Sequence, residues 1–295
     1  MYNIVGHRKI FFIISIILCG CSLLALILWG LKPGIDFTGG SLMEVEYSAN
    51  RPANSEIVQQ LSPLNLGEIN IQTIGDNSFI LRFKEINEDT HQAALKALGN
   101  NAKESKFESI GPIIGGELVK KSQYAVILAL IAMFFYIAWA FRKLANFSRQ
   151  NEYWRYSSGA IVALFHDILV MCGLFAVMGH FRGTEINALF ITAILTVLGY
   201  SINDTIVVFD RIRENVLLYG TRNMEETINK SINETIVRSL NTTITVILAL
   251  VAIYLFGGIS LQDFALAMMV GVGTGAYSSI AIASPFLLLF RKSAK

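Results

Sequence analysis

Residues 186–209 read INALFITAILTVLGYSINDTIVVF, and Asp204 is the only charged residue among them. A helix needs about 20 mostly apolar residues to cross the hydrocarbon core of a bilayer. The stretch therefore predicts a membrane-spanning helix with one carboxylate inside it. Five further stretches are similarly apolar, so the sequence predicts an all-α bundle of six membrane helices. These five are residues 10–30, 124–141, 157–178, 236–256 and 264–290.

Charge is distributed unevenly along the 295 residues, of which 16% are charged. Residues 31–121 hold 9 Lys/Arg and 12 Asp/Glu, 21 in 91 positions, close to the roughly 25% of soluble domains. The other 204 residues share the remaining 25 charges. The sequence thus predicts three parts: the amino terminus and first helix (1–30), an inserted water-soluble domain (31–121), and helices two to six (122–295).

Hydrophobic periodicity inside the inserted domain changes between two and 3.6 residues. The resulting order, β-α-β-β-α-β, is that of a ferredoxin-like α/β domain. The expected strands are 41–47, 68–74, 78–83 and 107–110, and the expected helices are 54–61 and 88–98. His91, expected on the exposed face of the second helix, has no nucleophile spaced near it. The domain is therefore interpreted as a binding or docking module rather than an enzyme.

Positive residues predict the orientation of the helices, because Lys and Arg collect on the cytoplasmic side of short loops. With the amino terminus inside, thirteen Lys and Arg fall on the cytoplasmic side and only Arg182 falls in a short external loop. Both termini are therefore expected in the cytoplasm, and the inserted domain outside it.

Three charged residues lie within the predicted spans, where each costs about 2.5–3.5 kcal/mol on insertion scales. They are Asp167, Asp204 and Arg238. Asp204 precedes the cytoplasmic end of its helix by about seven residues, roughly 10 Å, and Arg238 follows Ile232 by about six on the next, antiparallel helix. The two therefore lie at one depth and can neutralise each other.

Two interpretations of this pair remain open: a static lock between helices, or a carboxylate that binds and releases a proton. Because an arginine does not give up its proton, Asp204 is the member that would titrate. Ser201, Asn203 and Thr242 are candidate accessory residues beside it. Asp167 fits a structural hydrogen bond as well as proton handling. Its neighbour His166 points about 100° away on the helix and is interpreted as a packing residue.

Residues 210–234 are predicted to form an amphipathic segment along the cytoplasmic interface, with a break at 218–220. No Gly-x-x-x-x-Gly-Lys-Ser/Thr loop is present, so any work must come from a gradient or a partner. No cofactor or metal is expected, with protons as the only coupling ion. The net charge of +2 does not indicate a nucleic-acid partner, and membrane lipids are the surroundings expected.

Several ordered motifs are familiar: GIDFTGG at 34–40, ALFHD at 163–167, GYSINDT at 199–205, VVFDRIREN at 207–215 and LFGG at 255–258. Together they resemble the SecD/SecF family of bacterial protein-export membrane proteins, in its SecF branch. The resemblance implies half of a transporter core of the resistance-nodulation-division (RND) type. It also implies SecD, the SecYEG channel, the translocating preprotein and, as a candidate, YajC as partners in the inner membrane.

The resemblance further implies use of the proton gradient in late-stage preprotein translocation, with the proton route through Asp204 and Arg238. A further carboxylate would come from SecD. Two other functions remain open. One is half of an RND-type exporter of lipids or small molecules, and the other is a structural scaffold for SecD. No nucleophile with a base is apparent, so the chain is not expected to be an enzyme.

Overall fold

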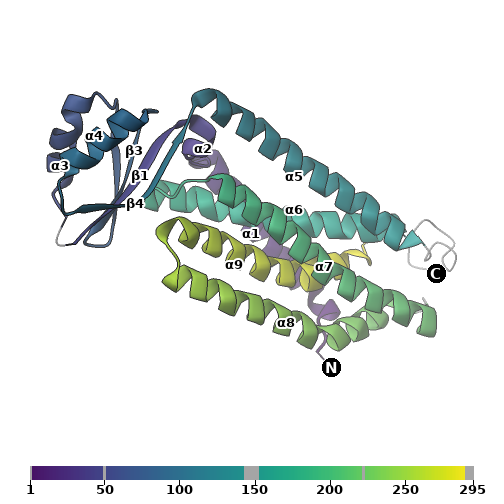
Figure 1. The fold of residues 1–295 in the computed structure, drawn as a ribbon. Coiled ribbons are helices and arrows are strands. Elements are labelled where there is room, and N and C mark those ends of the chain that lie inside the picture. Colours follow the sequence, from purple (N-terminus) through teal and green to yellow (C-terminus); the bar gives the residue numbers. More distant parts are fainter. Residues whose placement is uncertain (1, 49–50, 143–152, 221–222, 290–295) are drawn as a thin grey trace. The chain divides into compact units, whose positions relative to one another are not determined.

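The structure is a computed structural model that describes residues 2–48, 51–142, 153–220 and 223–289. The chain divides into two units. The helical unit comprises the described parts of Met1–Leu31, Tyr124–Thr184 and Leu189–Lys295, and the sheet unit comprises Lys32–Gln123 and Glu185–Ala188. Figure 1 shows the helices and the sheet that make up these units.

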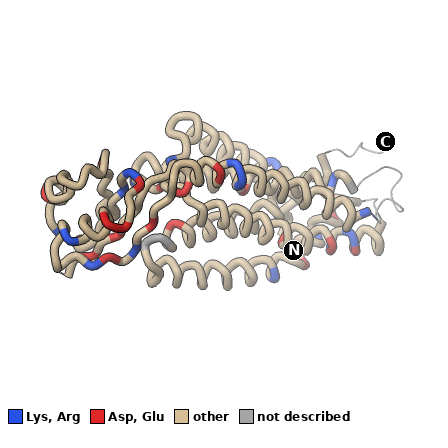
Figure 2. The backbone as a smooth tube through the Cα atoms, turned by 45° about the horizontal axis from the view of Figure 1, so that its top comes forward, with Lys and Arg blue, Asp and Glu red and all other residues tan. Residues whose placement is uncertain are grey.

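The six predicted spans are confirmed, because the described residues include six helices long and apolar enough to cross a membrane. Long uncharged stretches run along these helices, and charged residues gather near their ends (Figure 2). The helices are α1 (Arg8–Leu28), α5 (Pro112–Ala140), α6 (Tyr153–Arg182), α7 (Ala188–Tyr219), α8 (Met224–Phe256) and α9 (Ile259–Ser278). The sixth span continues from α9 through a π-helical turn at Ser279–Ala283 (η4) into α10 (Ser284–Phe286).

The amphipathic segment predicted at 210–234 is not a separate element. Helix α7 continues without interruption to Tyr219, and α8 begins at Met224, so both spans extend beyond their apolar stretches. The predicted break is confirmed at Gly220, whose φ of 76° ends α7. Continuous i to i+4 hydrogen bonding favours extending a helix already formed over starting a new one.

The amino-terminal segment is fastened to α8. The backbone N–H groups of Tyr2, Ile4 and Val5 donate to the side chains of Asn233 and Asn229 at 2.8–3.2 Å, and Arg8 forms an ion pair with Glu225 at 3.0 Å. The amino terminus therefore lies at the α7–α8 end of the helical unit. Several residues used for the orientation, among them Lys143, Arg149, Arg222 and Arg291, lie outside the described residues.

The sheet unit confirms the predicted ferredoxin-like topology. Its antiparallel strands lie in the order β2-β3-β1-β4. A core centred on Met43, Ile57 and Phe79 joins the sheet to its helices. The elements are β1 (Gly40–Tyr47), α3 (Asn54–Leu61), β2 (Asn70–Ile74), β3 (Ser78–Phe83), α4 (Glu88–Leu98) and β4 (Ala102–Ile110), preceded by the short α2 (Ile35–Thr38).

Two expectations for this unit were wrong. Strand β4 begins at Ala102 rather than at residue 107, because pairing with β1 recruits the polar residues before Phe107 into the sheet. His91, expected on an exposed face, is only 6% exposed. It stacks on Phe107 of the lengthened strand, with ring centroids 3.7 Å apart, and contacts Glu104 of that strand at 2.6 Å.

The two glycines that end GIDFTGG are required by the backbone. Gly39 and Gly40 have φ of 76° and 127°, a region that side chains with a Cβ rarely enter. A Cβ at Gly39 would lie 2.7 Å from Pro112 Cα, and one at Gly40 would lie 2.9 Å from the Phe83 carbonyl oxygen. The motif therefore allows β1 to start directly against β3 and the beginning of α5.

The loop between α6 and α7 belongs to the sheet unit. Residues Glu185–Ala188 form a short parallel bridge at Pro33 and Ile186, and the Ala188 N–H donates to Asp36 at 2.6 Å. Glu185 forms an ion pair with Arg82 of β3 at 2.8 Å. The loop that joins α6 to α7 is thus bonded to Pro33, to α2 and to β3.

A buried polar seam as the candidate functional site

Asp204 lies on α7 with only 6% of its surface exposed. Its Oδ1 accepts a hydrogen bond of 2.5 Å from Ser239 on α8. Its Oδ2 is buried and has no hydrogen-bond partner among the described residues. An unpaired oxygen on a buried carboxyl is costly, so the group has one satisfied atom and one atom open to a proton or a water.

Arg238 lies close to Asp204 but is not bonded to it. Within the described part of the chain, no ion pair joins Arg238 to Asp204 or to any other carboxylate, although the two side chains are within electrostatic range. The adjacent residue, Ser239, makes the direct contact instead. The predicted common depth places the two charges near each other, and the helix rotation decides which side chain faces Asp204.

The predicted accessory residues separate into two groups. Ser201 is fully buried and takes part in the seam described below. Asn203 and Thr242 are exposed on the helical unit, as Arg238 is. Thr242 donates to backbone carbonyl oxygens of its own helix, including that of Arg238 at 3.1 Å. Polar side chains therefore lie on the outer surface of α7 and α8 at the level of Asp204.

Asp167 on α6 is completely buried. Its Oδ2 accepts hydrogen bonds from Ser201 of α7 at 2.7 Å and from Ser278 of α9 at 2.8 Å. The carboxyl therefore links three helices at one point. Gly275 allows this approach, because a Cβ there would lie 2.9 Å from the Ser201 side chain.

His166 is buried, as expected of a packing residue, but it also contacts Asp167, which was not expected. Its Nδ1 lies 3.1 Å from Asp167 Oδ1, although neighbouring helical positions diverge by about 100°. The side chains of consecutive residues can bend back toward each other, and backbone direction alone does not exclude it. His166 is 3% exposed, and its Nε2 has no partner among the described residues.

Two consecutive serines connect the surroundings of the two carboxyls. Ser278 bonds to Asp167, and Ser279 contacts Thr205 of α7 at 2.8 Å and lies beside Asp204. The π-helical turn starts at Ser279, and such turns inside α-helices occur frequently at functional sites. We call Asp167, Ser201, Asp204, Ser239, Ser278 and Ser279 the polar seam.

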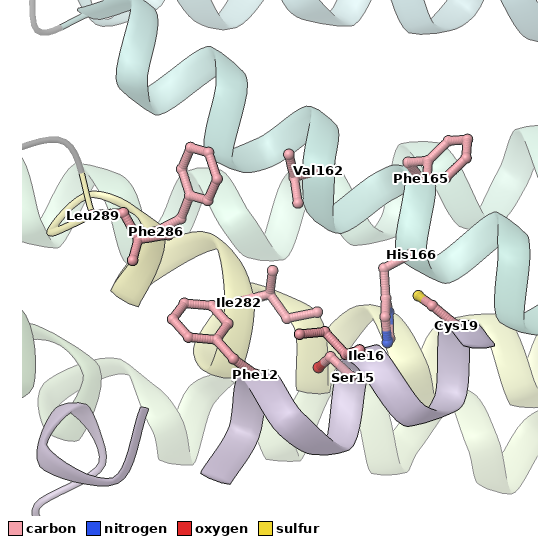
Figure 3. Close-up of a pocket in the computed structure, with 10 residues that line it drawn as sticks. All are labelled: Phe12, Ser15, Ile16, Cys19, Val162, Phe165, His166, Ile282, Phe286 and Leu289. Atoms are coloured by element: carbon pink, nitrogen blue, oxygen red, sulfur yellow. The ribbon is translucent and has the colours of Figure 1, made fainter. Parts of the chain in front are cut away.

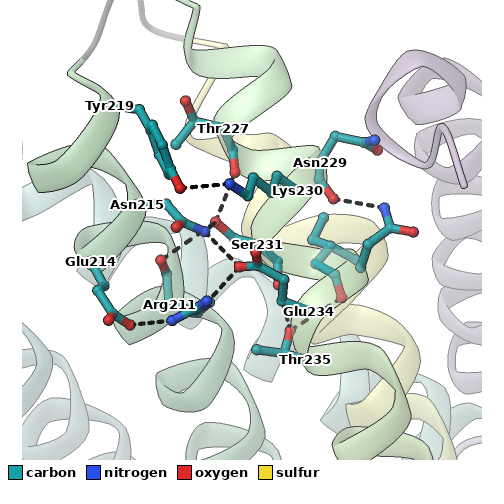
Figure 4. A network of polar contacts seen from close by, with 12 residues as sticks. Arg211, Glu214, Asn215, Tyr219, Thr227, Asn229, Lys230, Ser231, Glu234 and Thr235 are labelled. Carbon is teal, nitrogen blue, oxygen red and sulfur yellow. Dashed lines mark hydrogen bonds and ion pairs between the residues drawn. The ribbon is translucent and has the colours of Figure 1, made fainter. Parts of the chain in front are cut away.

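A second polar network lies where α7 and α8 meet (Figure 4). Arg211 donates to Glu234 at 2.6 Å and to Glu214 at 2.5 Å. Asn215 donates to Glu234 at 2.8 Å and to Ser231 at 2.9 Å. One ion pair of this network, Arg211–Glu234, joins α7 to α8, whereas the pairs Arg211–Glu214 and Asp210–Arg213 lie within α7.

Sequence reasoning did not identify Ser239, Ser278 or Ser279 as site residues. Serine is common where helices pack closely in membranes, so a single serine gives no distinct signal. Their helical spacing offers one, because Ser278 lies three residues after Gly275 on the face that approaches α7. Within the described residues, no group of three His, Cys, Asp or Glu side chains could hold a metal ion.

The fold and the seam define a class: a multi-pass membrane protein with buried carboxyls and one inserted ferredoxin-like domain. Residues 90–293 match the family described as protein export membrane protein SecD/SecF, C-terminal. Residues 30–50 match the SecD/SecF GG motif, which contains Gly39 and Gly40. The chain belongs to the SecD/SecF family.

Relatives cover nearly the whole chain. A protein translocase subunit SecF from Anaerolinea thermophila is 39% identical over 98% of this chain and 94% of its own length. Another from Thermobaculum terrenum is 38% identical over 99% and 98%. The crystal structure of SecDF, a translocon-associated membrane protein from Thermus thermophilus, matches 97% of this chain at 29% identity with a TM-score of 0.82. This chain spans 38% of that longer SecDF chain.

Proposed function

We propose that this chain acts with SecD in the bacterial inner membrane and uses the proton gradient to promote late-stage translocation of preproteins, beside the SecYEG channel and with YajC as a candidate further partner. Membership of the SecD/SecF family and the translocase names of its relatives support the transport role. Asp204 carries the proposed coupling to protons. No cofactor takes part, and the chain does not act as an enzyme.

The observation that carries this proposal is the half-satisfied carboxyl of Asp204. Oδ1 is held by Ser239, so the group has a fixed orientation, and Oδ2 is buried with no partner within the described ranges. In an apolar interior an unpaired carboxylate is strongly disfavoured. Binding a proton at Oδ2 removes the charge, and its release requires water or a cation nearby. A carboxyl of this kind gains or loses a proton when its access to water changes.

Arg238 is placed to stabilise the unprotonated state. It lies within electrostatic range of Asp204 and is exposed on the unit, with Asn203 and Thr242. A charged side chain that faces lipid costs up to about 2.5–3.5 kcal/mol, the value at the centre of a span. A partner that covers this surface and supplies a carboxylate would offset that cost. The solved SecDF chain, which is longer than this one, supports SecD as that partner.

The orientation is proposed with both termini in the cytoplasm. The amino terminus and the α7–α8 loop lie at one end of the helical unit, as this orientation requires. Positive residues, including Arg8, Arg211 and Arg213, lie in the segments assigned to the cytoplasmic side. The sheet unit is then on the outer side of the membrane, where an emerging chain would meet it.

The test follows preprotein release into vesicles that carry this chain with SecD and SecYEG, with and without a proton gradient. Asp204→Asn keeps the size and an acceptor for Ser239 but cannot ionise, so the gradient-dependent part of release should be lost. Asp204→Glu should retain part of it. Asp210→Asn, an exposed carboxylate on the same helix, is the matched control and should behave as wild type.

Other results would favour the alternatives. If Asp204→Asn and wild type respond equally to collapse of the gradient, proton coupling through Asp204 is wrong and a scaffold role for SecD remains. If release is unaffected by deleting the chain while lipid or small-molecule export falls, the chain is half of an RND-type exporter.

A further inference from the structure

A second buried carboxyl in the helical unit has no part in the function proposed above. Asp167 is on α6, whereas Asp204 is on α7, and Asp167 is the more deeply buried of the two. Ser201 and Ser278 donate hydrogen bonds to it, and His166 Nδ1 lies 3.1 Å from its Oδ1. None of these is a fixed positive charge. The contacts of this carboxyl are therefore those of a group that can be neutral.

His166 cannot easily hold a positive charge for Asp167. A charged imidazole is a donor at both nitrogens, and Nε2 of His166 is buried with no acceptor in the part of the chain that the structure describes. The ring lines a cavity of about 500 Å³ between α1, α6 and the end of the last span (Figure 3). That cavity is lined almost wholly by apolar side chains such as Phe12, Ile16 and Ile282. The proton of the pair therefore belongs on Asp167.

The other titratable groups around Asp167 do not change this conclusion. Cys19 of α1 is within electrostatic range of the carboxyl but would add a negative charge if ionised. Tyr277 of α9 has its ring 6.0 Å from that of His166 and donates to the Phe11 carbonyl oxygen at 3.0 Å. In the described residues, no Lys or Arg forms an ion pair with Asp167.

The seam connects this carboxyl to Asp204. Ser201 and Asp204 are three residues apart on α7 and so share one face of it. Ser278 bonds to Asp167, and the next residue, Ser279, lies beside Asp204 and bonds to Thr205. The π-helical turn that starts there is stabilised by Ser284, which donates to the Ser279 carbonyl oxygen at 2.8 Å. A change in the protonation of one carboxyl therefore alters hydrogen bonds on the helices that hold the other carboxyl.

We propose that Asp167 is a second proton-binding residue of this chain, coupled to Asp204 through Ser201, Ser278 and Ser279. When the Asp167 proton leaves, the carboxylate accepts shorter and stronger hydrogen bonds from the two serines and draws α7 and α9 toward α6. When the proton returns, these bonds weaken. The charge of Asp167 thus sets how tightly α7, which carries Asp204, is held. This inference rests on the proposed coupling of Asp204 to protons.

The test is infrared spectroscopy of the complex with SecD in lipid, because a protonated carboxyl absorbs apart from a carboxylate. At low pH, wild type should show two buried carboxylic acids of this chain, besides any that SecD supplies. Asp204→Asn should remove the carboxylic-acid band of Asp204 and leave that of Asp167. The separate variant Asp167→Asn should remove the band that Asp204→Asn leaves. Asp210→Asn should remove neither. Absence of any buried carboxylic acid in Asp204→Asn would overturn the proposal, and this arm does not depend on Asp167→Asn folding.

Gradient-driven preprotein release in the same variants separates the two proposals. Asp167→Asn should lower the gradient-dependent rate about 10²-fold, the lower end of what loss of a proton-transfer group costs, and Asp167→Glu should restore part of it. If Asp204→Asn abolishes the gradient response and Asp167→Asn matches Asp210→Asn, the second site is wrong and the function stands. If preprotein release in Asp204→Asn still depends on the gradient, the proposed coupling of Asp204 to protons is wrong, and the inference about Asp167 is wrong with it.

Discussion

The two units each contain a buried histidine in contact with carboxyl groups, and the difference between the two contacts separates structural from functional roles. His91 has both ring nitrogens paired, Nδ1 with Glu88 at 3.2 Å and Nε2 with Glu104 at 2.6 Å. The Glu88 side chain is 69% exposed and that of Glu104 is 21% exposed. His166 has one nitrogen paired with a carboxyl that is not exposed at all.

Access to water explains why the same pair of groups behaves differently. Glu88 and Glu104 stay hydrated, so they can remain charged and hold a charged His91. Burial opposes that charge, but the hydrogen bonds to Glu104 and Glu88 outweigh it and raise the pKa of His91. Asp167 has no such hydration, and the Nε2 of His166 has no partner among the residues that the structure describes. A fully satisfied polar cluster rigidifies the structure around it, whereas an unpaired polar group in a low dielectric is costly.

The largest expected effect comes from removing the Asp167 side chain. Asp167→Ala leaves Ser201, Ser278 and His166 without their hydrogen-bond partner in an apolar interior, which should destabilise the packing of α6, α7 and α9 by about 2–5 kcal/mol. Asp167→Asn keeps an acceptor oxygen and should cost less. Hydrogen exchange of these helices in the full chain measures the difference. Equal protection of these helices in Asp167→Ala and Asp210→Ala would contradict a structural role for Asp167 in the polar seam.

A somewhat smaller effect is expected at the other histidine. His91→Ala removes two hydrogen bonds and the stacking on Phe107, and it leaves a cavity beside β4, so the sheet unit should lose about 2–3 kcal/mol. Exchange of amides in α4 and β4 of the full chain reports this loss. Lys96→Ala, an exposed change on the same helix, should leave the exchange rates as they are. Exchange unchanged in His91→Ala would show that the cluster is not structural.

Removing one donor should cost less than removing the shared acceptor. In Ser278→Ala, Asp167 Oδ2 keeps its bond from Ser201, so the loss should be about 1 kcal/mol. Because the proposed coupling to Asp204 runs through this serine, the gradient response should fall more than the stability does. If Ser278→Ala lowers the stability without changing the gradient response, Ser278 does not take part in the coupling between Asp167 and Asp204.

The smallest effect is a pH dependence of the sheet unit. The pKa of His91 is raised in the folded chain, so its contribution to stability is complete below the unfolded value of about 6.5 and is lost as pH rises through the folded value. The hydrogen bonds from Gln92 and His91 lower the pKa of Glu88, so its contribution is lost at the acid end. Protection of α4 should therefore decline above neutral pH, and His91→Gln should abolish that decline.

Much of the fold could be predicted because apolar periodicity specifies it directly. The six spans and the β-α-β-β-α-β order follow from runs of apolar residues and their spacing, as 186–209 illustrates. The start of β4 could not be predicted, because residues Ala102–Lys106 read AKESK and give no strand signal. Pairing with β1 alone makes them a strand, and that pairing is what buries His91.

Residue counting could predict the depth of Asp204 and Arg238 along their helices, but not the rotation of α8 about its own axis. Counting residues from the helix ends placed Asp204 and Arg238 at one level, and the structure brings Asp204 into contact with Ser239, the residue after Arg238. Adjacent helical positions differ by about 100°, and the packing of α8 against its neighbours fixes that angle. The same reason explains why the donors at Ser278 and Ser279 were not distinguished from ordinary packing residues.

The most direct test of the central claim is proton flux into liposomes that hold this chain with SecD and SecYEG, followed with a pH-sensitive dye while a preprotein is engaged. If Asp204 binds and releases the coupling proton, wild type should admit protons only during translocation and Asp204→Asn should admit none above protein-free liposomes. Equal flux in wild type and Asp204→Asn would contradict the account.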